Sequence, residues 1–246
     1  MSTLEERREF AVAGTDQDGF APPRVFLQPI AAPSILGLFG FGAATFIVAA
    51  NLAGWYGTPH SPLYLAPFAA TFGGVAQFLA GMWAYRARDG VATAMHGMWG
   101  SFWIAYGILN VLLATHALAT PVPWYHQPEV GYWFFALAII TASGALASLG
   151  ESLGLFAVLS TLAAGSGILA GAFIYGSHTW TEVAGWVLVF SAGFAWYTAT
   201  GMMLAGTSGR TILPLFKYAT KANKPGAKPH RTIELEWAEP GIKHGQ

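Results

Sequence analysis

The chain contains no cysteine, and only 10% of its 246 residues are charged. The first absence excludes disulfides, thiolate nucleophiles and cysteine-ligated metal centres. The second places the chain far below the roughly 25% charged residues of ordinary soluble domains. Basic and acidic residues number 12 each. No basic surplus is therefore available to neutralise phosphates, and a nucleic-acid partner is not expected.

Long apolar runs take the place of charge, since 54% of the residues are hydrophobic. A helix needs about 20 apolar residues to cross the hydrocarbon core of a bilayer. The sequence predicts an all-α membrane protein with six transmembrane helices. The predicted spans are Ser34–Gly54, Tyr64–Tyr85, Thr93–His116, Gly131–Gly150, Leu153–Ile174 and Thr181–Ala205.

The basic residues define an orientation. Three of the 12 precede the first span, two lie between the second and third, and seven follow the sixth. All of them therefore fall on one side of a six-span protein, and the positive-inside rule makes that side cytoplasmic. We expect both termini to be cytoplasmic, in a plasma membrane such as the bacterial inner membrane.

Three segments follow from this pattern. Residues 1–33 are predicted to form a cytoplasmic or interfacial N-terminal segment, without the apolar core of a secretory signal. Residues 34–205 form the transmembrane domain. Residues 206–246 form a polar, lysine-rich cytoplasmic tail that is available to a protein partner.

Enzyme motifs are missing from the sequence. It has no phosphate-binding glycine loop and no carboxylate pair within a span. Glu151 falls in the turn between the fourth and fifth spans, where we expect it to face water. His96 and His116 lie too near the ends of the third span to suit a haem bundle. We expect no enzyme activity, no catalytic residue and no cofactor.

Four histidines are expected at the extracytoplasmic face, namely His60, His116, His126 and His178. They are either separate water-facing side chains or a converging set that senses pH. Their spacing matches no metal-ligand motif, so no metal site is predicted.

Uncharged polar and aromatic side chains at membrane depth are candidates to line a pore for a small neutral or protonatable solute. The candidates are Gln77, Ser101, Trp103, Tyr106, Asn110, Tyr197 and Thr200. Asn110 and Gln77 are costly to place in lipid, so each requires either a polar cavity or a bond to another helix.

Glycines recur through the first three spans at positions that favour close helix packing. The predicted packing glycines are Gly37, Gly40, Gly73, Gly74, Gly97, Gly100 and Gly107. Gly97, Gly100 and Gly107, which lie in the stretch "GMWGSFWIAYG", share one face of the predicted helix. The opposite face carries Trp99, Trp103, Tyr106 and Asn110. We interpret the first face as a packing surface and the second as part of a gate.

Four motifs occur in the order found in one family: "LGLFGFGAATF", "FGGVAQFLAG", "GSFW" and "GRTILP". The chain resembles the acetate uptake transporter family, which includes bacterial acetate–succinate permeases and fungal ammonia–acetate export proteins. The resemblance implies six helices around a central pore in each protomer, a hexameric ring, and transport of small monocarboxylates with a proton. It also implies a pore constriction at Phe41, Trp99 and Leu162.

This sequence departs from the family pattern at several positions. Ala32-Pro33-Ser34-Ile35 replaces the family's Asn-Pro-Ala-Pro, and Ala84 and Met202 stand where relatives carry glutamates. Trp99 stands where tyrosine is common.

Three functions remain open at this stage. The first is a permease or channel for acetate-sized monocarboxylates, carried as the protonated acid or with a symported proton. The second is a transporter scaffold reused as an accessory subunit of a larger membrane complex. The third is a channel for another small solute such as ammonia, formate or carbon dioxide.

Overall fold

The computed structural model describes residues 30–58 and 60–217, and within them every regular element is a helix. Helix α2 (Pro33–Leu52) is the first. The second span is composite, with α3 (Ser61–Phe68) and α4 (Gln77–Ala87) joined by a π-helical segment, η1 (Ala69–Ala76). The remaining helices are α5 (Gly90–Ala114), α6 (Pro128–Ser148), α7 (Leu153–Tyr175) and α8 (His178–Ser208).

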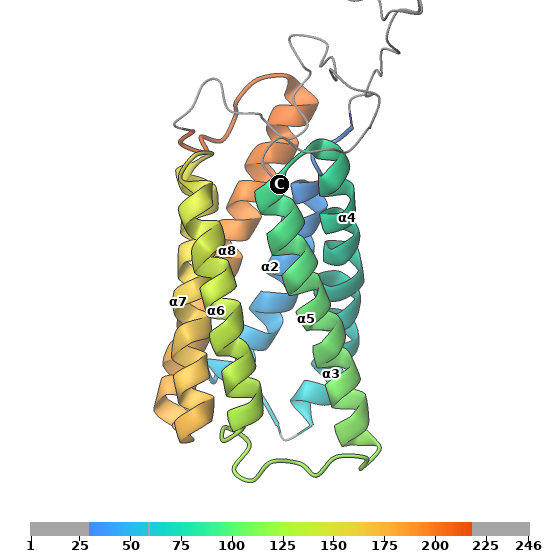
Figure 1. The fold of residues 1–246 in the computed structure, drawn as a ribbon, viewed down its shortest axis with the longest axis vertical. Coiled ribbons are helices and arrows are strands. Elements are labelled where there is room, and N and C mark those ends of the chain that lie inside the picture. The colour runs from blue at the N-terminus through green and yellow to red at the C-terminus, as the bar shows by residue number, and fades with distance from the viewer. Residues whose placement is uncertain (1–29, 59, 218–246) are drawn as a thin grey trace, which may run out of the picture. The chain divides into compact units, whose positions relative to one another are not determined.

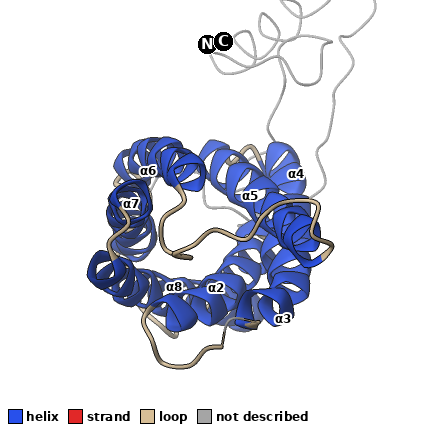
Figure 2. Cartoon of the chain, turned by 90° about the horizontal axis from the view of Figure 1, so that it is seen from below, coloured by secondary structure: helices blue, strands red, loops and turns tan. Residues whose placement is uncertain are grey.

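These helices form six spans that are long and apolar enough to cross a membrane, which confirms the predicted fold class and span number within the described residues. The helices run side by side (Figure 1). Seen end-on they form a closed ring, in which α2 packs between α8 and the composite second span (Figure 2). Large apolar side chains such as Trp83, Trp133 and Phe190 are exposed on the outside of this bundle, as expected of a lipid-facing surface.

The predicted span boundaries are off by up to three residues. The second, third, fourth and sixth spans each begin three residues before the predicted first residue. The reason is that polar residues and prolines start these helices. Asp89 accepts a bond from the Ala92 backbone N–H at 2.8 Å, and Ser177 accepts one from Trp180 at 3.4 Å. Hydropathy alone does not detect such caps.

Glycines bring the backbones of neighbouring helices close together. A Cβ atom on Gly100 would lie 2.7 Å from the Phe78 backbone nitrogen, and one on Gly107 would lie 2.6 Å from Ala70 Cβ. Both substitutions would separate α5 from the second span. Among the other predicted packing glycines, Gly40 faces the Phe72 carbonyl, Gly73 faces Trp103 and Gly74 faces Ile104.

Gly97 differs from the other packing glycines. A Cβ added to it would meet no heavy atom within 4 Å. Its backbone is instead the surface against which Gly81 packs, because a Cβ on Gly81 would lie 2.7 Å from the Gly97 nitrogen. The close contact at this level of the bundle therefore depends on Gly81.

Candidate functional site

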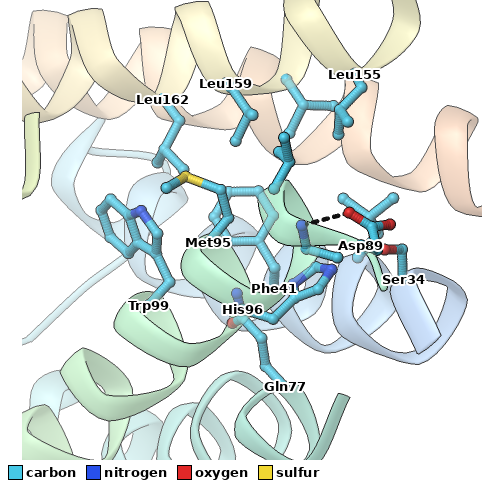
Figure 3. Close-up of a pocket in the computed structure, with 14 residues that line it drawn as sticks. Ser34, Phe41, Gln77, Asp89, Met95, His96, Trp99, Leu155, Leu159 and Leu162 are labelled. Atoms are coloured by element: carbon cyan, nitrogen blue, oxygen red, sulfur yellow. Dashed lines mark hydrogen bonds between the residues drawn. The ribbon is translucent and has the colours of Figure 1, made fainter. Parts of the chain in front are cut away.

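A cavity of about 30 Å³ lies inside the bundle, where α2, α4, α5 and α7 meet. This is enough space for at least one water molecule. Figure 3 shows the side chains that line it. Trp99 and Leu162 lie on one side, Asp89 and Ser34 lie on the other, and His96 and Gln77 approach from a third direction.

We define the apolar end of the cavity by Phe41, Trp99 and Leu162, the three residues of the predicted constriction. All three are buried and line the cavity, with exposed fractions of 2%, 3% and 1%. The rings of Phe41 and Trp99 meet edge to face, with centroids 6.2 Å apart. The structure thus brings these side chains together from α2, α5 and α7.

A hydrogen bond to a fourth helix fixes the orientation of Trp99. Its indole Nε1 donates to Thr141 Oγ1 of α6 at 2.9 Å, and the threonine hydroxyl donates onward to the Leu137 carbonyl at 2.6 Å. Phe102 packs against Trp99 with ring centroids 5.3 Å apart, and against Phe134 of α6 at 5.1 Å. The Trp99 ring is therefore held by both a polar and an aromatic contact.

We define the polar end by Ser34, Gln77, Asp89 and His96, which are all buried. The Asp89 carboxylate caps α5, and burial raises its pKa, while hydrogen bonds from the backbones of Ala92 and Val91 lower it. Gln77 Oε1 and His96 Nδ1 are buried and have no hydrogen-bond partner among the described residues. Such atoms are costly in a protein interior, so the polar end is suited to a hydrogen-bonding solute.

The remaining pore-lining candidates lie elsewhere in the bundle. Trp103 and Asn110 are buried further along α5, and Asn110 Nδ2 donates to the Tyr106 carbonyl of its own helix at 2.9 Å. Ser101 is exposed and donates to the Gly97 carbonyl at 2.8 Å. Tyr197, 37% exposed, donates to the Pro214 carbonyl at 2.8 Å.

Tyr106 and Thr200 are partly buried, and neither contributes to the lining of the cavity. Gln77 is the member of the pore-lining set that reaches it. The structure therefore separates the predicted candidates into a cavity group, a second buried group along α5, and an outer group.

Sequence reasoning did not place His96 or Asp89 in the site. His96 lies three residues before Trp99 on α5, so the two side chains share a helix face. That spacing was the available signal. Asp89 could have been identified as the cap of α5 from its position before the apolar run.

Glu151 lies in the turn between α6 and α7, as expected, but it is partly buried rather than fully water-facing. Burial and, to a smaller extent, the negative charge of Asp89 raise its pKa to about 7, although Lys217 opposes the shift. The segment that follows α8 covers this end of α7, because the Leu153 and Gly154 backbone N–H groups donate to the Phe216 and Leu215 carbonyls at 3.1 and 3.2 Å.

The four histidines of the opposite face do not form a metal centre, since no group of three or more potential ligands is found within the described ranges. His178 lies 3.7 Å from the Glu182 carboxylate, and its ring contacts Trp124 and Tyr125.

Comparison with known proteins gives one consistent result. Residues 13–218 match the GPR1/FUN34/yaaH family. An uncharacterized protein of Methanothermobacter thermautotrophicus is 31% identical over 193 residues, which cover 77% of this chain and 93% of that protein. The succinate-acetate/proton symporter SatP of Escherichia coli is 27% identical over 186 residues, covering 76% of this chain and 95% of the symporter.

A fungal relative and a solved structure extend the comparison. The ammonia transport outward protein 2 of Saccharomyces cerevisiae is 26% identical over 201 residues, covering 77% of this chain and 66% of that protein. The structure of the bacterial acetate channel SatP superimposes with a TM-score of 0.69 at 24% identity, covering 76% of this chain and 99% of the channel. The fold of the six-helix bundle is therefore that of a known channel.

Proposed function

Because the chain belongs to the GPR1/FUN34/yaaH family, we propose that it is a membrane permease or channel for acetate and related small monocarboxylates. The observation that carries the proposal is the cavity between Phe41, Trp99 and Leu162 at one end and buried polar groups at the other. The names of the Escherichia coli symporter and of the superimposed channel support the same substrate class.

The apolar end favours a neutral solute. Moving a carboxylate out of water into an apolar passage without partners is very costly, whereas a protonated carboxyl group pays only the smaller penalty of an uncharged polar group. Acetate is therefore expected to pass the constriction as acetic acid, or together with a proton.

Uptake of labelled acetate by proteoliposomes tests this function. The flux should rise as the external pH falls toward the carboxyl pKa of about 4–5, because the neutral fraction of the solute then increases. Empty liposomes at each pH provide the background permeation of acetic acid. Uptake no faster than this background, with or without a pH gradient, would contradict the proposed function.

The protein is an integral membrane protein, as its six apolar spans and its family show. We place both termini on the cytoplasmic side of a plasma membrane, because the sequence has all its basic residues on that side of the spans. The family resemblance also supports a homo-hexamer that acts without enzyme activity or cofactor. Residues 206–246 would form a cytoplasmic tail able to bind a protein partner.

Ammonia is a second candidate solute. The observation that favours it is the fungal relative named for outward ammonia transport. Ammonia is small and uncharged in the form that could pass an apolar constriction. Stopped-flow alkalinisation of proteoliposomes exposed to an ammonium gradient separates the two solutes, since acetic acid acidifies the lumen and ammonia makes it alkaline.

A further inference from the structure

The polar end of the cavity contains a buried histidine whose Nδ1 has no hydrogen-bond partner among the described residues. His96 is 5% exposed and Gln77 is 2% exposed. The imidazole Nδ1 and the amide Oε1 are both enclosed, and neither has a partner among the described residues. Both side chains line the cavity, from α5 and α4 respectively.

The first helix is shaped to accept this imidazole. The ring of His96 lies directly against the backbone of Gly37, so closely that a Cβ at this position would overlap the ring. The missing side chain of Gly37 therefore leaves room for the His96 ring, whereas most of the other packing glycines leave room for a neighbouring helix. A side chain that is tightly held and still lacks a bond is preorganised to bind a ligand.

The charges around His96 limit what the ligand can be. Asp89 and His96 are the titratable groups among the residues that line the cavity. Helix α2 presents Ser34, Leu38 and Phe41, α4 presents Gln77, and α7 presents leucines and a valine, so these helices add no charge. Outside the cavity, Glu151 is close enough to Asp89 for their charges to interact, and Lys217 interacts with Glu151.

We propose that His96, assisted by Gln77, forms a binding subsite for the carboxyl group of the transported acid and shares a proton with it. In one form, neutral imidazole bonds the O–H of the carboxylic acid. In the other, the proton has moved from the carboxyl oxygen to a ring nitrogen, which leaves a carboxylate beside an imidazolium. The number of protons is the same in both forms, and the pair has no net charge in either.

This neutrality explains why the subsite can function inside a membrane. A carboxylate alone beside Asp89 would place two negative charges in a buried cavity, which is strongly unfavourable. A carboxylate accompanied by its proton on His96 adds no net charge. The subsite rests on the proposed function for its solute, and it adds the residue that holds the proton next to the apolar constriction.

Two variants of His96 test the subsite in proteoliposomes. His96→Phe keeps an aromatic ring against Gly37 but removes both nitrogens, and it should lower acetate uptake roughly tenfold or more, as expected for loss of a hydrogen bond to a charged group. Uptake of acetamide, an uncharged analogue of similar size, should change by less than about twofold on the same reasoning. The exposed His60→Phe variant is the matched control and should behave as the wild type.

The second variant separates proton holding from hydrogen bonding. His96→Gln can bond the neutral acid but cannot take its proton. Its acetate uptake should therefore match the wild type below about pH 4, where the acid is largely neutral, and fall more steeply as the pH rises. A merely structural role for His96 would lower uptake at every pH and for acetamide alike, and that result would overturn the proposal.

Binding can be followed without any transport. In protein labelled with ¹⁵N-histidine, the His96 signal is the one lost in His96→Phe, and it should shift on addition of acetate but not of acetamide. If the wild type failed to transport acetate while this signal still shifted, the proposed function would fail and the subsite would stand. If acetate were transported but the signal did not move, the subsite would be wrong.

Discussion

The two ends of the cavity satisfy their polar atoms in different ways. At the apolar end, the one buried polar atom of the constriction residues, Trp99 Nε1, is bonded to Thr141 of α6. At the polar end, His96 and Gln77 each retain a buried atom that has no partner within residues 30–58 and 60–217. Protein interiors rarely leave such atoms unbonded. The fold itself therefore completes the apolar end, whereas the proposed subsite would complete the polar end with a solute.

Substituting Trp99 should produce the largest effect, because it removes the bulkiest side chain of the apolar end. Trp99→Ala is expected to widen the constriction and raise the flux of both acetate and acetamide. It should also cost about 3–5 kcal/mol of stability, the usual cost of truncating a buried tryptophan. Flux is measured in proteoliposomes and stability by thermal unfolding in detergent.

The matched control for Trp99 is Trp103→Ala on the same helix. Trp103 is equally buried, at 4% exposure, but it does not line the cavity. It should lose a similar amount of stability without gaining flux. If both variants gained flux equally, or neither did, Trp99 would not be part of a gate.

Gly37→Ala should disturb the polar end while leaving the apolar end intact. The added methyl group overlaps the His96 imidazole and must displace it, whereas Phe41 and Trp99 keep their contact. We expect acetate uptake to fall severalfold and acetamide uptake to remain near that of the wild type. Gly97→Ala is the control, since a Cβ there meets no heavy atom within 4 Å. Normal acetate uptake by a folded Gly37→Ala protein would separate the glycine from the subsite.

Thr141→Val tests how far the apolar end depends on its hydrogen bond. The substitution preserves shape but leaves the buried indole N–H of Trp99 without its acceptor, which should cost about 1–3 kcal/mol. Thr161→Val is the control, because that hydroxyl bonds carbonyls of its own helix. A Thr141→Val protein as stable as the Thr161→Val protein would show that Trp99 does not need this partner.

Much of the fold could be predicted from the sequence, because transmembrane helices are recognised by the length and hydropathy of their apolar runs. Six apolar runs gave six spans, and errors were confined to the ends, where caps such as Asp89 are polar. The family motifs also predicted that Phe41, Trp99 and Leu162 belong together, and the structure places them around one cavity.

The polar end was less accessible to sequence reasoning. From hydropathy, His96 is only a polar residue near the end of a span. Its proposed role depends on Gly37 and Gln77, which belong to other helices and are not adjacent to it in the sequence. Ser101 and Tyr197 illustrate the opposite error. Their hydroxyls lie at membrane depth but bond nearby carbonyls on the outer part of the bundle. Which side chains converge depends on helix rotation, and rotation is set by contacts such as those of Gly81 and Gly100.

The smallest expected effect concerns Glu151, which lies beyond the polar end and interacts with Asp89. Its pKa is raised to about 7, from an ordinary value of 4.5, so folding favours the protonated form. The wild-type protein should therefore gain stability as the pH falls from about 7 toward 4.5, because the folded state takes up a proton more readily than the unfolded state. Glu151→Gln should weaken this dependence by removing the titrating group.

Thermal unfolding in detergent at a series of pH values measures the effect, with the exposed Glu129→Gln as the control. Partial exposure of Glu151 lets solvent screen its charge, so the change in melting temperature should be smaller than for Thr141→Val. Acetate uptake by Glu151→Gln should keep the wild-type dependence on pH, because the proton that accompanies the solute is held by His96. If uptake instead lost the wild-type pH dependence in Glu151→Gln and retained it unchanged, with no steeper fall, in His96→Gln, the proton-holding group would lie at the turn between α6 and α7 rather than inside the cavity.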